Sequence, residues 1–225
     1  MDLNELSQRY TGKAASTYND NRVGGEKWES EQAAFRPILA GIERGANVLD
    51  VPVGTGRLIP FYKEFGLNLT GLDISEDMLK EASAAAEECG LTARFEKGDI
   101  LRLQFDDRTF DAAIAIRLLN WIDTPLFRQA VRELARVSNR HVILGVRYLT
   151  SLRDIGAGKG GLLRWIRQKL GKAKRNMRRT GLVYHPKSAV MEAFRELGLV
   201  IEESRCVERR SDGTDYFIYR LAKVA

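Results

Sequence analysis

Residues 48–57 read VLDVPVGTGR, and this stretch predicts a buried strand, a glycine turn and the first residues of a helix. Three of its first four side chains are apolar, as in a strand that is covered on both faces. Gly54 and Gly56 permit positive φ angles and let the backbone approach a ligand closely. The helix that follows would direct its free N–H groups toward a ligand over the turn. The stretch therefore predicts a nucleotide-binding turn.

The chain has 225 residues, of which 44% are hydrophobic, and we expect a single domain spanning residues 1–225. The first ten residues lack the apolar run of a secretory leader, and no stretch predicts a membrane-spanning helix. Cys89 and Cys206 lie far apart without metal-ligand spacing, so we expect reduced thiols in a cytoplasmic protein. With only two histidines, His141 and His185, no histidine-based metal site is expected.

The net charge of +6 originates in one segment. Residues 153–182 hold ten Lys or Arg and one acid, a balance of +9, which leaves 6 − 9 = −3 for the remainder. We interpret residues 150–183 as a basic, lid-like insertion, and residues 1–45 as an N-terminal cap segment that precedes the sheet. Within the cap segment, residues 26–35 predict a helix that Pro37 breaks or kinks.

Strands and helices are predicted to alternate from residue 47 onward. Strands are expected at 47–51, 69–73, 93–97, 110–116 and 141–146, with helices between them at 57–65, 76–89 and 123–137. After the basic insertion we expect a helix at 186–197 and strands at 199–207 and 216–222, joined by a turn at 211–214. This order predicts a three-layer α/β fold with a Rossmann-like sheet of seven strands, mostly parallel, with an antiparallel C-terminal strand.

Two acids follow neighbouring strands, where ligands of parallel sheets bind. Asp73 ends the second strand, and Ser75 is better placed than Asp73 to cap the next helix. Asp99 follows the third strand and, taken alone, is equally well explained as a turn residue. Ile59 occupies the position of the third glycine of the dinucleotide fingerprint. These features favour a nucleoside ligand without a pyrophosphate.

Four stretches in this order, VLDVPVGTGR, GLDIS, EKGDI and FDAAIAI, resemble the class I S-adenosylmethionine-dependent methyltransferases. The resemblance covers residues 47–146 and implies that the glycine turn holds the methionine end of the cofactor. It also implies that Asp73 binds both ribose hydroxyls, that Asp99 binds the adenine amino group, and that Ile100 lies beside the adenine ring. The chain departs from the family pattern at Pro52, which replaces the first glycine of the turn.

The resemblance implies a set of residues around S-adenosylmethionine: Asp50, Val51, Pro52, Gly54, Thr55, Gly56, Arg57, Asp73, Ile74, Met78, Gly98, Asp99, Ile100, Ile116 and Arg117, with Tyr18 and Arg22 of the cap segment. Arg57 and Arg22 are candidates for the methionine carboxylate. A cation at the beginning of a helix opposes the helix dipole, which favours a ligand anion near Arg57. The alternative is that Arg57 is a solvated surface residue.

Residues 117–121 follow the fourth strand and are expected to face the methyl acceptor. The candidates for acceptor binding are Arg117, Asn120, Trp121 and Tyr184. Members of the family that this chain resembles often carry the motif [ND]-P-P-[YF] at this point when they methylate planar amino groups on nucleic acids or glutamine. The motif is absent here, which disfavours methylation of DNA or glutamine. Tyr148 and His185 are candidates for a general base, although a structural role beside the start of a helix, with the ring bonded to the backbone, explains His185 better. No other catalytic residue is expected, because a sulfonium leaving group needs mainly alignment and desolvation.

The basic insertion has three interpretations: a lid over the acceptor, a contact with an anionic membrane surface, or an RNA contact. Trp165 is its one aromatic residue, so stacking of single-stranded RNA is poorly supported. We therefore expect a cytoplasmic enzyme that methylates a small-molecule or lipid-linked acceptor of anionic character. The membrane interpretation of the insertion adds a peripheral membrane location to this expectation. The alternatives are an RNA methyltransferase and a non-catalytic module that binds the cofactor.

Overall fold

The computed structural model describes residues 12, 17, 25–149, 181–210 and 214–224. The predictions for Tyr18, Arg22 and Trp165 lie outside these residues, as do most of the basic insertion and much of the cap segment. No helix among the described ranges has the length and apolar character that crossing a bilayer requires.

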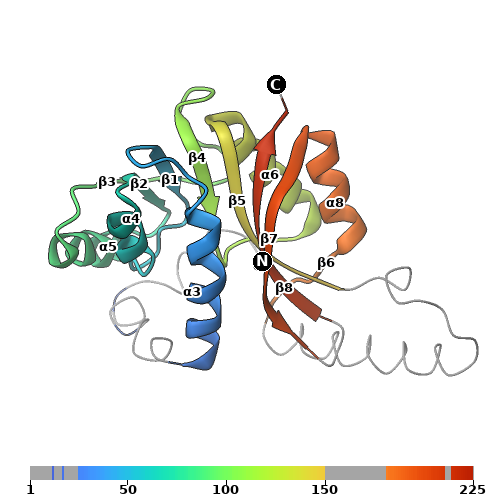
Figure 1. Ribbon diagram of the computed structural model, residues 1–225, viewed down its shortest axis with the longest axis horizontal. Helices are drawn as coiled ribbons and strands as arrows, with labels where there is room; N and C mark the ends of the chain where they lie inside the picture. Colours follow the sequence, from blue (N-terminus) through green and yellow to red (C-terminus); the bar gives the residue numbers. More distant parts are fainter. Residues whose placement is uncertain (1–11, 13–16, 18–24, 150–180, 211–213, 225) are drawn as a thin grey trace, which may run out of the picture.

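Eight strands of the described chain form one sheet in the order β3-β2-β1-β4-β5-β8-β7, with β6 beside β5 (Figure 1). The strands are β1 Asn47–Asp50, β2 Asn68–Asp73, β3 Arg94–Lys97, β4 Phe110–Ala115, β5 Ser138–Leu149, β6 His185–Pro186, β7 Leu199–Arg209 and β8 Thr214–Lys223. Strands β1 to β5 are parallel, whereas β8 is antiparallel to both β5 and β7. This confirms the predicted Rossmann-like sheet, to which the two-residue β6 is an addition.

Helices cover both faces of the sheet and create two separate cores. Helices α3 (Glu26–Leu39), α4 (Ile59–Phe65) and α5 (Glu76–Cys89) pack on one face around Val48, Ile114 and Ile143. Helices α6 (Thr124–Val137) and α8 (Lys187–Glu196) pack on the other face with Leu49 and Leu144. Residues that alternate along the strands therefore serve opposite cores, which is why the strands read as continuous apolar runs.

Capping residues define the helix next to the glycine turn. Helix α5 begins after Ser75, whose Oγ accepts a hydrogen bond from the Met78 N–H at 3.4 Å. It ends at Gly90, which has a positive φ of 66° and donates its N–H to the last turn. Both boundaries match the sequence prediction, and they place the N-terminal end of α5 directly after Asp73.

A break of helix α3 at Pro37 was one of the two predicted outcomes and is wrong, because the helix continues to Leu39; the alternative, a kink, stays a prediction. Pro37 lies in the last turn, where it removes only one hydrogen bond. The residues that follow, Ile38 and Leu39, are fully buried in the core beneath the helix. Burial of two such side chains contributes about 3–6 kcal/mol, which outweighs the cost of about 3 kcal/mol for a proline in a helix.

Candidate active site

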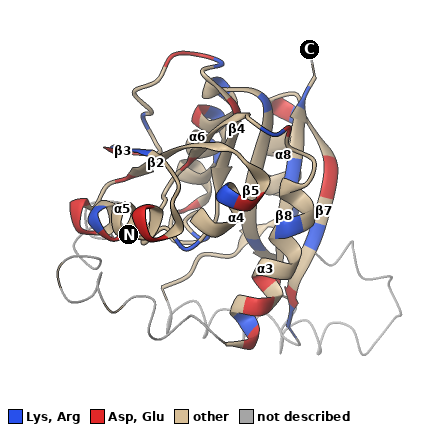
Figure 2. Cartoon of the chain, turned by 60° about the vertical axis from the view of Figure 1, so that its left-hand side comes forward, with Lys and Arg blue, Asp and Glu red and all other residues tan. Residues whose placement is uncertain are grey.

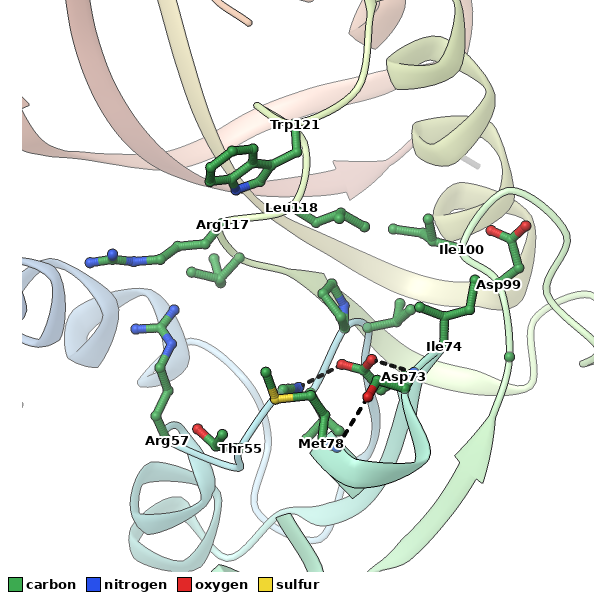
Figure 3. A pocket seen from close by; sticks show the side chains of 17 residues that line it. Thr55, Arg57, Asp73, Ile74, Met78, Asp99, Ile100, Arg117, Leu118 and Trp121 are labelled. Atoms are coloured by element: carbon green, nitrogen blue, oxygen red, sulfur yellow. Dashed lines mark hydrogen bonds between the residues drawn. The ribbon is translucent and has the colours of Figure 1, made fainter. Parts of the chain in front are cut away.

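A cleft opens at the C-terminal ends of β1 to β4, where a doubly wound sheet binds its ligand (Figure 3). Its volume is about 850 Å³, counted out to open solvent. It is lined by Val51, Pro52, Val53, Gly54, Thr55, Arg57, Asp73, Ile74, Ser75, Met78, Gly98, Asp99, Ile100, Ile116, Arg117, Leu118 and Trp121. Asp73 and Asp99 lie on one side of the cleft, and Arg57 and Arg117 lie on the other (Figure 3).

The glycine turn forms the floor of the cleft through two glycines with different roles. Gly54 has a φ of 56°, and a Cβ added there would meet no atom within 4 Å, so it borders open space. Gly56 has a φ of 76° and does not line the cleft. A Cβ at Gly56 would lie 2.6 Å from Ile59 Cδ1 and 3.0 Å from Ala82 Cα, so this glycine lets α5 pack closely. The turn contains a cis peptide bond between Val51 and Pro52.

Asp73 is held rigidly at the edge of the cleft by backbone donors. Its Oδ2 accepts the Gly54 N–H at 3.0 Å, and its Oδ1 accepts the Ser75 N–H at 2.9 Å. Burial raises the pKa of this carboxyl, and the backbone N–H groups act in the opposite direction. An ionised carboxylate has about four lone-pair sites, and the N–H groups of Gly54, Ile74 and Ser75 occupy three, so Asp73 retains acceptor capacity for a hydroxyl group of a ligand.

Asp99 forms the second acidic position of the cleft, in the turn after β3. Its Oδ1 accepts the Leu101 N–H at 2.8 Å, which orients the carboxylate. Its Oδ2 accepts no hydrogen bond from the residues that the structure describes, so it is available to a ligand donor. Ile100, which is buried, and Leu118 provide the apolar surface of the cleft near this acid (Figure 3).

Both arginines of the cleft bind one buried carboxylate, that of Glu31 on helix α3. Glu31 is only 1% exposed, and it lies on the same helix face as the buried Ala34 and Phe35. Its Oε1 pairs with Arg57, and its Oε2 accepts the Arg117 Nε–H at 2.6 Å. Burial acts to raise the pKa of Glu31, but the two guanidinium groups hold it below its usual value. The interpretation of Arg57 as a solvated residue is therefore wrong, since its side chain is 11% exposed and ion-paired.

Asp50 lies beneath the glycine turn, fully buried and outside the cleft lining. The Tyr62 hydroxyl, which is also fully buried, lies close to the Asp50 carboxyl group. Burial raises the pKa of Asp50 to about 7, although the nearby Tyr62 hydroxyl and the Arg57 charge oppose this shift. Asp50 is therefore a carboxyl whose charge changes near neutral pH.

Comparison with known proteins agrees with this geometry. Residues 48–141 match the family described as "Methyltransferase domain". A phosphatidylethanolamine N-methyltransferase from Cereibacter sphaeroides is 32% identical over 142 residues, which cover 62% of this chain and 66% of that protein. A ubiquinone/menaquinone biosynthesis C-methyltransferase from Bdellovibrio bacteriovorus is 38% identical over 102 residues, 44% of this chain and 42% of that protein. The matches thus span less than two thirds of the length of these relatives.

The fold is also similar to that of a solved methyltransferase, over almost the whole chain. The magnesium protoporphyrin IX methyltransferase of Synechocystis PCC 6803, solved with bound S-adenosylhomocysteine, superposes with a TM-score of 0.74 at 18% identity. The superposition covers 99% of this chain and 100% of that chain. Residues 48–141 form a class I S-adenosylmethionine-dependent methyltransferase domain. The cofactor of this family is S-adenosylmethionine.

The residues that line the cleft of this methyltransferase also fit S-adenosylmethionine by their chemistry, without reference to relatives. An open cradle above Gly54, two carboxylates with unused acceptor sites and an apolar wall near Ile100 match a nucleoside with two ribose hydroxyls and an adenine amino group. Of the described residues that the sequence placed around the cofactor, all line the cleft except Asp50 and Gly56, which support the turn from below. Three lining residues were not predicted: Val53, Ser75 and Leu118.

The two candidate bases of the methyltransferase do not line this cleft. His185 is fully buried, with Nε2 2.7 Å from the Leu119 carbonyl and Nδ1 3.2 Å from the Thr124 hydroxyl. Burial lowers the pKa of His185, which favours a neutral ring that donates from Nε2. Tyr148 is buried in the opposite core, where it accepts a hydrogen bond from the Tyr219 hydroxyl at 3.1 Å. The contacts of His185 therefore agree with its structural interpretation.

Two of the four acceptor candidates, Arg117 and Trp121, line the cleft, and the other two are buried elsewhere. The Asn120 amide donates to the carbonyls of Arg147 and Val183 at 2.8 and 3.0 Å, and its Oδ1 accepts the Arg147 N–H at 2.8 Å. Asn120 thus ties the segment after β4 to β5. Tyr184 is buried, and its hydroxyl accepts a hydrogen bond from Arg210.

Proposed function

We propose that this protein transfers the methyl group of S-adenosylmethionine to a small-molecule or lipid-linked acceptor that carries a negative charge. The proposal rests on the distribution of charge in the cleft. The carboxylates of Asp73 and Asp99, which accept hydrogen bonds, lie on one side, and the arginines lie on the other (Figure 3). The carboxylates suit the hydroxyl and amino donors of a nucleoside. The arginines suit anions.

The residues of the chain would act by positioning and by excluding water. When bound, S-adenosylmethionine supplies a methyl group on a sulfonium, which a nucleophilic atom of the acceptor displaces in line. Asp73 and the Gly54 turn would hold the nucleoside end in a fixed position, because their own hydrogen bonds already fix their orientation. Ile116, Leu118 and Trp121 form an apolar wall that would exclude water from the transfer.

The class of acceptor is supported by two independent features. Arg117 lies at the end of β4, on the side of the cleft away from the carboxylates (Figure 3). The two relatives described above are named for phosphatidylethanolamine and for ubiquinone or menaquinone, which are lipids. Both features agree with an acceptor that combines an apolar body with a polar or anionic group.

Methyl transfer from labelled cofactor tests the proposal. The purified protein is incubated with S-adenosylmethionine labelled in the methyl group and with a cell extract, which is then separated into lipid, nucleic-acid and small-molecule fractions. We expect label in the lipid or small-molecule fraction, and at least a tenfold loss with Asp73→Asn. The variant Asp111→Asn is the matched control, because Asp111 binds the Asn47 N–H at the opposite end of the sheet. Label confined to RNA, or absent from all fractions, would contradict the proposal.

A further inference from the structure

A second hollow lies next to the cofactor cleft, and Arg117 lines both. Its volume is about 590 Å³ including open solvent, and it lies between helix α3 and strands β5, β7 and β8. It is lined by Glu26, Lys27, Ser30, Arg117, Arg147, Val207, Glu208 and Tyr216. Acidic and basic residues alternate along α3 and β7 in Figure 2, so the overall charge of these elements does not by itself mark a site.

Arg117 and Arg147, which line the hollow, do not use all of their N–H donors in contacts with the described residues. Arg117 uses Nε for Glu31, and neither of its terminal nitrogens bonds a residue that the structure describes. Its backbone has a φ of 72°, a conformation that costs a non-glycine residue energy, and the residue lines both hollows. Arg147 donates from Nη1 to Glu208 at 2.7 Å, and its guanidinium lies 4.6 Å from the centre of the Tyr216 ring.

Tyr216 adds a buried donor without a partner. The residue is 2% exposed, and its hydroxyl makes no hydrogen bond with any described residue. A Cβ at Gly145 would lie 2.6 Å from this hydroxyl and 3.3 Å from Ile116 Cδ1, so the hydroxyl lies close to a residue of the cofactor cleft. Burial of a hydroxyl without a hydrogen bond is unfavourable, and a ligand acceptor would remove this cost.

The charges around the hollow favour an anion. Three cations line it, Lys27, Arg117 and Arg147, and Arg210 pairs with Glu208 of its lining. Two acids line it, Glu26 and Glu208, and Glu31 pairs with Arg117, so the balance is 4 − 3 = +1. Glu31 and Glu208 are each already shared by two arginines. The groups left without partners at the inner end of the hollow are thus donors.

We propose that this second hollow is the acceptor's anion site, and that it binds a phosphate or carboxylate through Arg117, Arg147 and the Tyr216 hydroxyl. The inference rests on the proposed function in so far as it makes the anion part of the methyl acceptor. The bound oxyanion would fix the distance between the acceptor's reactive atom and the cofactor cleft, with Arg117 as the shared wall.

Calorimetric titration of simple oxyanions tests the site. Inorganic phosphate, acetate and a short-chain phosphatidic acid below its micelle concentration are titrated at constant ionic strength, into the free protein and into protein saturated with S-adenosylhomocysteine. Tyr216→Phe removes only the unpartnered hydroxyl, and Arg117→Lys removes the terminal nitrogens while it keeps a cation near Glu31. Tyr219→Phe is the matched control on the same strand, because its hydroxyl bonds Tyr148 in the opposite core.

We expect saturable binding of at least one oxyanion, weakened about tenfold by Tyr216→Phe and by Arg117→Lys but not by Tyr219→Phe. The oxyanion that binds most tightly identifies the source of the anion, a free phosphate, a carboxylate or a lipid headgroup. The absence of saturable binding in both forms of the protein, or equal binding by all variants, would overturn the inference. Because S-adenosylhomocysteine binding is measured in the same preparations, its failure would contradict the proposed function separately.

Discussion

Replacement of Glu31 by glutamine removes the negative charge that Arg57 and Arg117 share, while it keeps the shape of the side chain. Glu31 is 1% exposed, Arg57 is 11% exposed and Arg117 is 30% exposed, so the nearly buried Arg57 would lose an ion-pair partner. Removal of one partner of a buried pair costs about 3–5 kcal/mol. We take about 3 kcal/mol, because Arg117 can turn its charge toward water.

For a chain of this size, 1 kcal/mol corresponds to about 2–4 °C in Tm, so Glu31→Gln is expected to lower Tm by about 6–12 °C. Differential scanning calorimetry at pH 7.5 measures the change. Glu29→Gln is the matched control, because Glu29 lies on the exposed face of the same helix, and it is expected to shift Tm by less than about 2 °C.

The effect of Glu31 has a defined dependence on pH. Its pKa is held below the ordinary value of 4.5, so its stabilising contribution is complete above pH 4.5 and is lost as the pH falls further. The difference in Tm between wild type and Glu31→Gln should therefore be constant from pH 6 to 8. A Tm for Glu31→Gln within about 2 °C of wild type at pH 7.5 would refute the idea that this carboxylate is a buried ionic link.

Three further predictions follow from other residues around the cleft. Because the pKa of Asp50 is raised to about 7, its ionisation in the folded protein costs stability as the pH rises from about 4 to 7. Asp50→Asn should therefore raise the free energy of unfolding relative to wild type by about 2–4 kcal/mol at pH 8, with a smaller gain at pH 5. An equal difference at both pH values would argue against this titration. Gly56→Ala should lower the free energy of unfolding by about 1–3 kcal/mol in urea titrations, because its Cβ would clash with Ile59, whereas Gly54→Ala should impair cofactor binding more than stability. His185→Gln should lower stability in the same titrations and leave the pH profile of methyl transfer unchanged, and a shifted profile would restore His185 as a base.

The parts of the fold that could be predicted are those encoded locally. Helix α5 was predicted with its observed bounds because Ser75 and Gly90 mark its ends in the sequence itself. The side of the cleft that holds Asp73 and Asp99 was predictable because the C-terminal ends of neighbouring parallel strands meet at one edge of a sheet. The end of helix α3 was not predictable from local sequence, because burial of Ile38 and Leu39 depends on the core beneath them.

Arg57 and Arg117 were predicted to line the opposite side of the cleft, but their ion pairs with Glu31 were beyond prediction because these contacts join distant parts of the chain. Glu31 and Arg117 are 86 positions apart, and no local pattern in the helix that carries Glu31 indicates an ion pair. Tyr216 reaches the same region from the last strand, beside Arg147. Sequence spacing also could not distinguish Gly54, which borders the cleft, from Gly56, which faces α5.

The central claim is that Asp73 and the glycine turn bind the nucleoside of S-adenosylmethionine. Calorimetric titration with S-adenosylhomocysteine tests it most directly, on wild type, Asp73→Asn and the control Asp111→Asn. We predict saturable binding of one molecule per chain, weakened by about 30-fold or more in Asp73→Asn, since hydrogen bonds to a charged acceptor contribute about 1.5–3 kcal/mol each, and unchanged within about twofold in Asp111→Asn. No saturable binding by the wild type, or equal affinity in the wild type and Asp73→Asn, would contradict the claim.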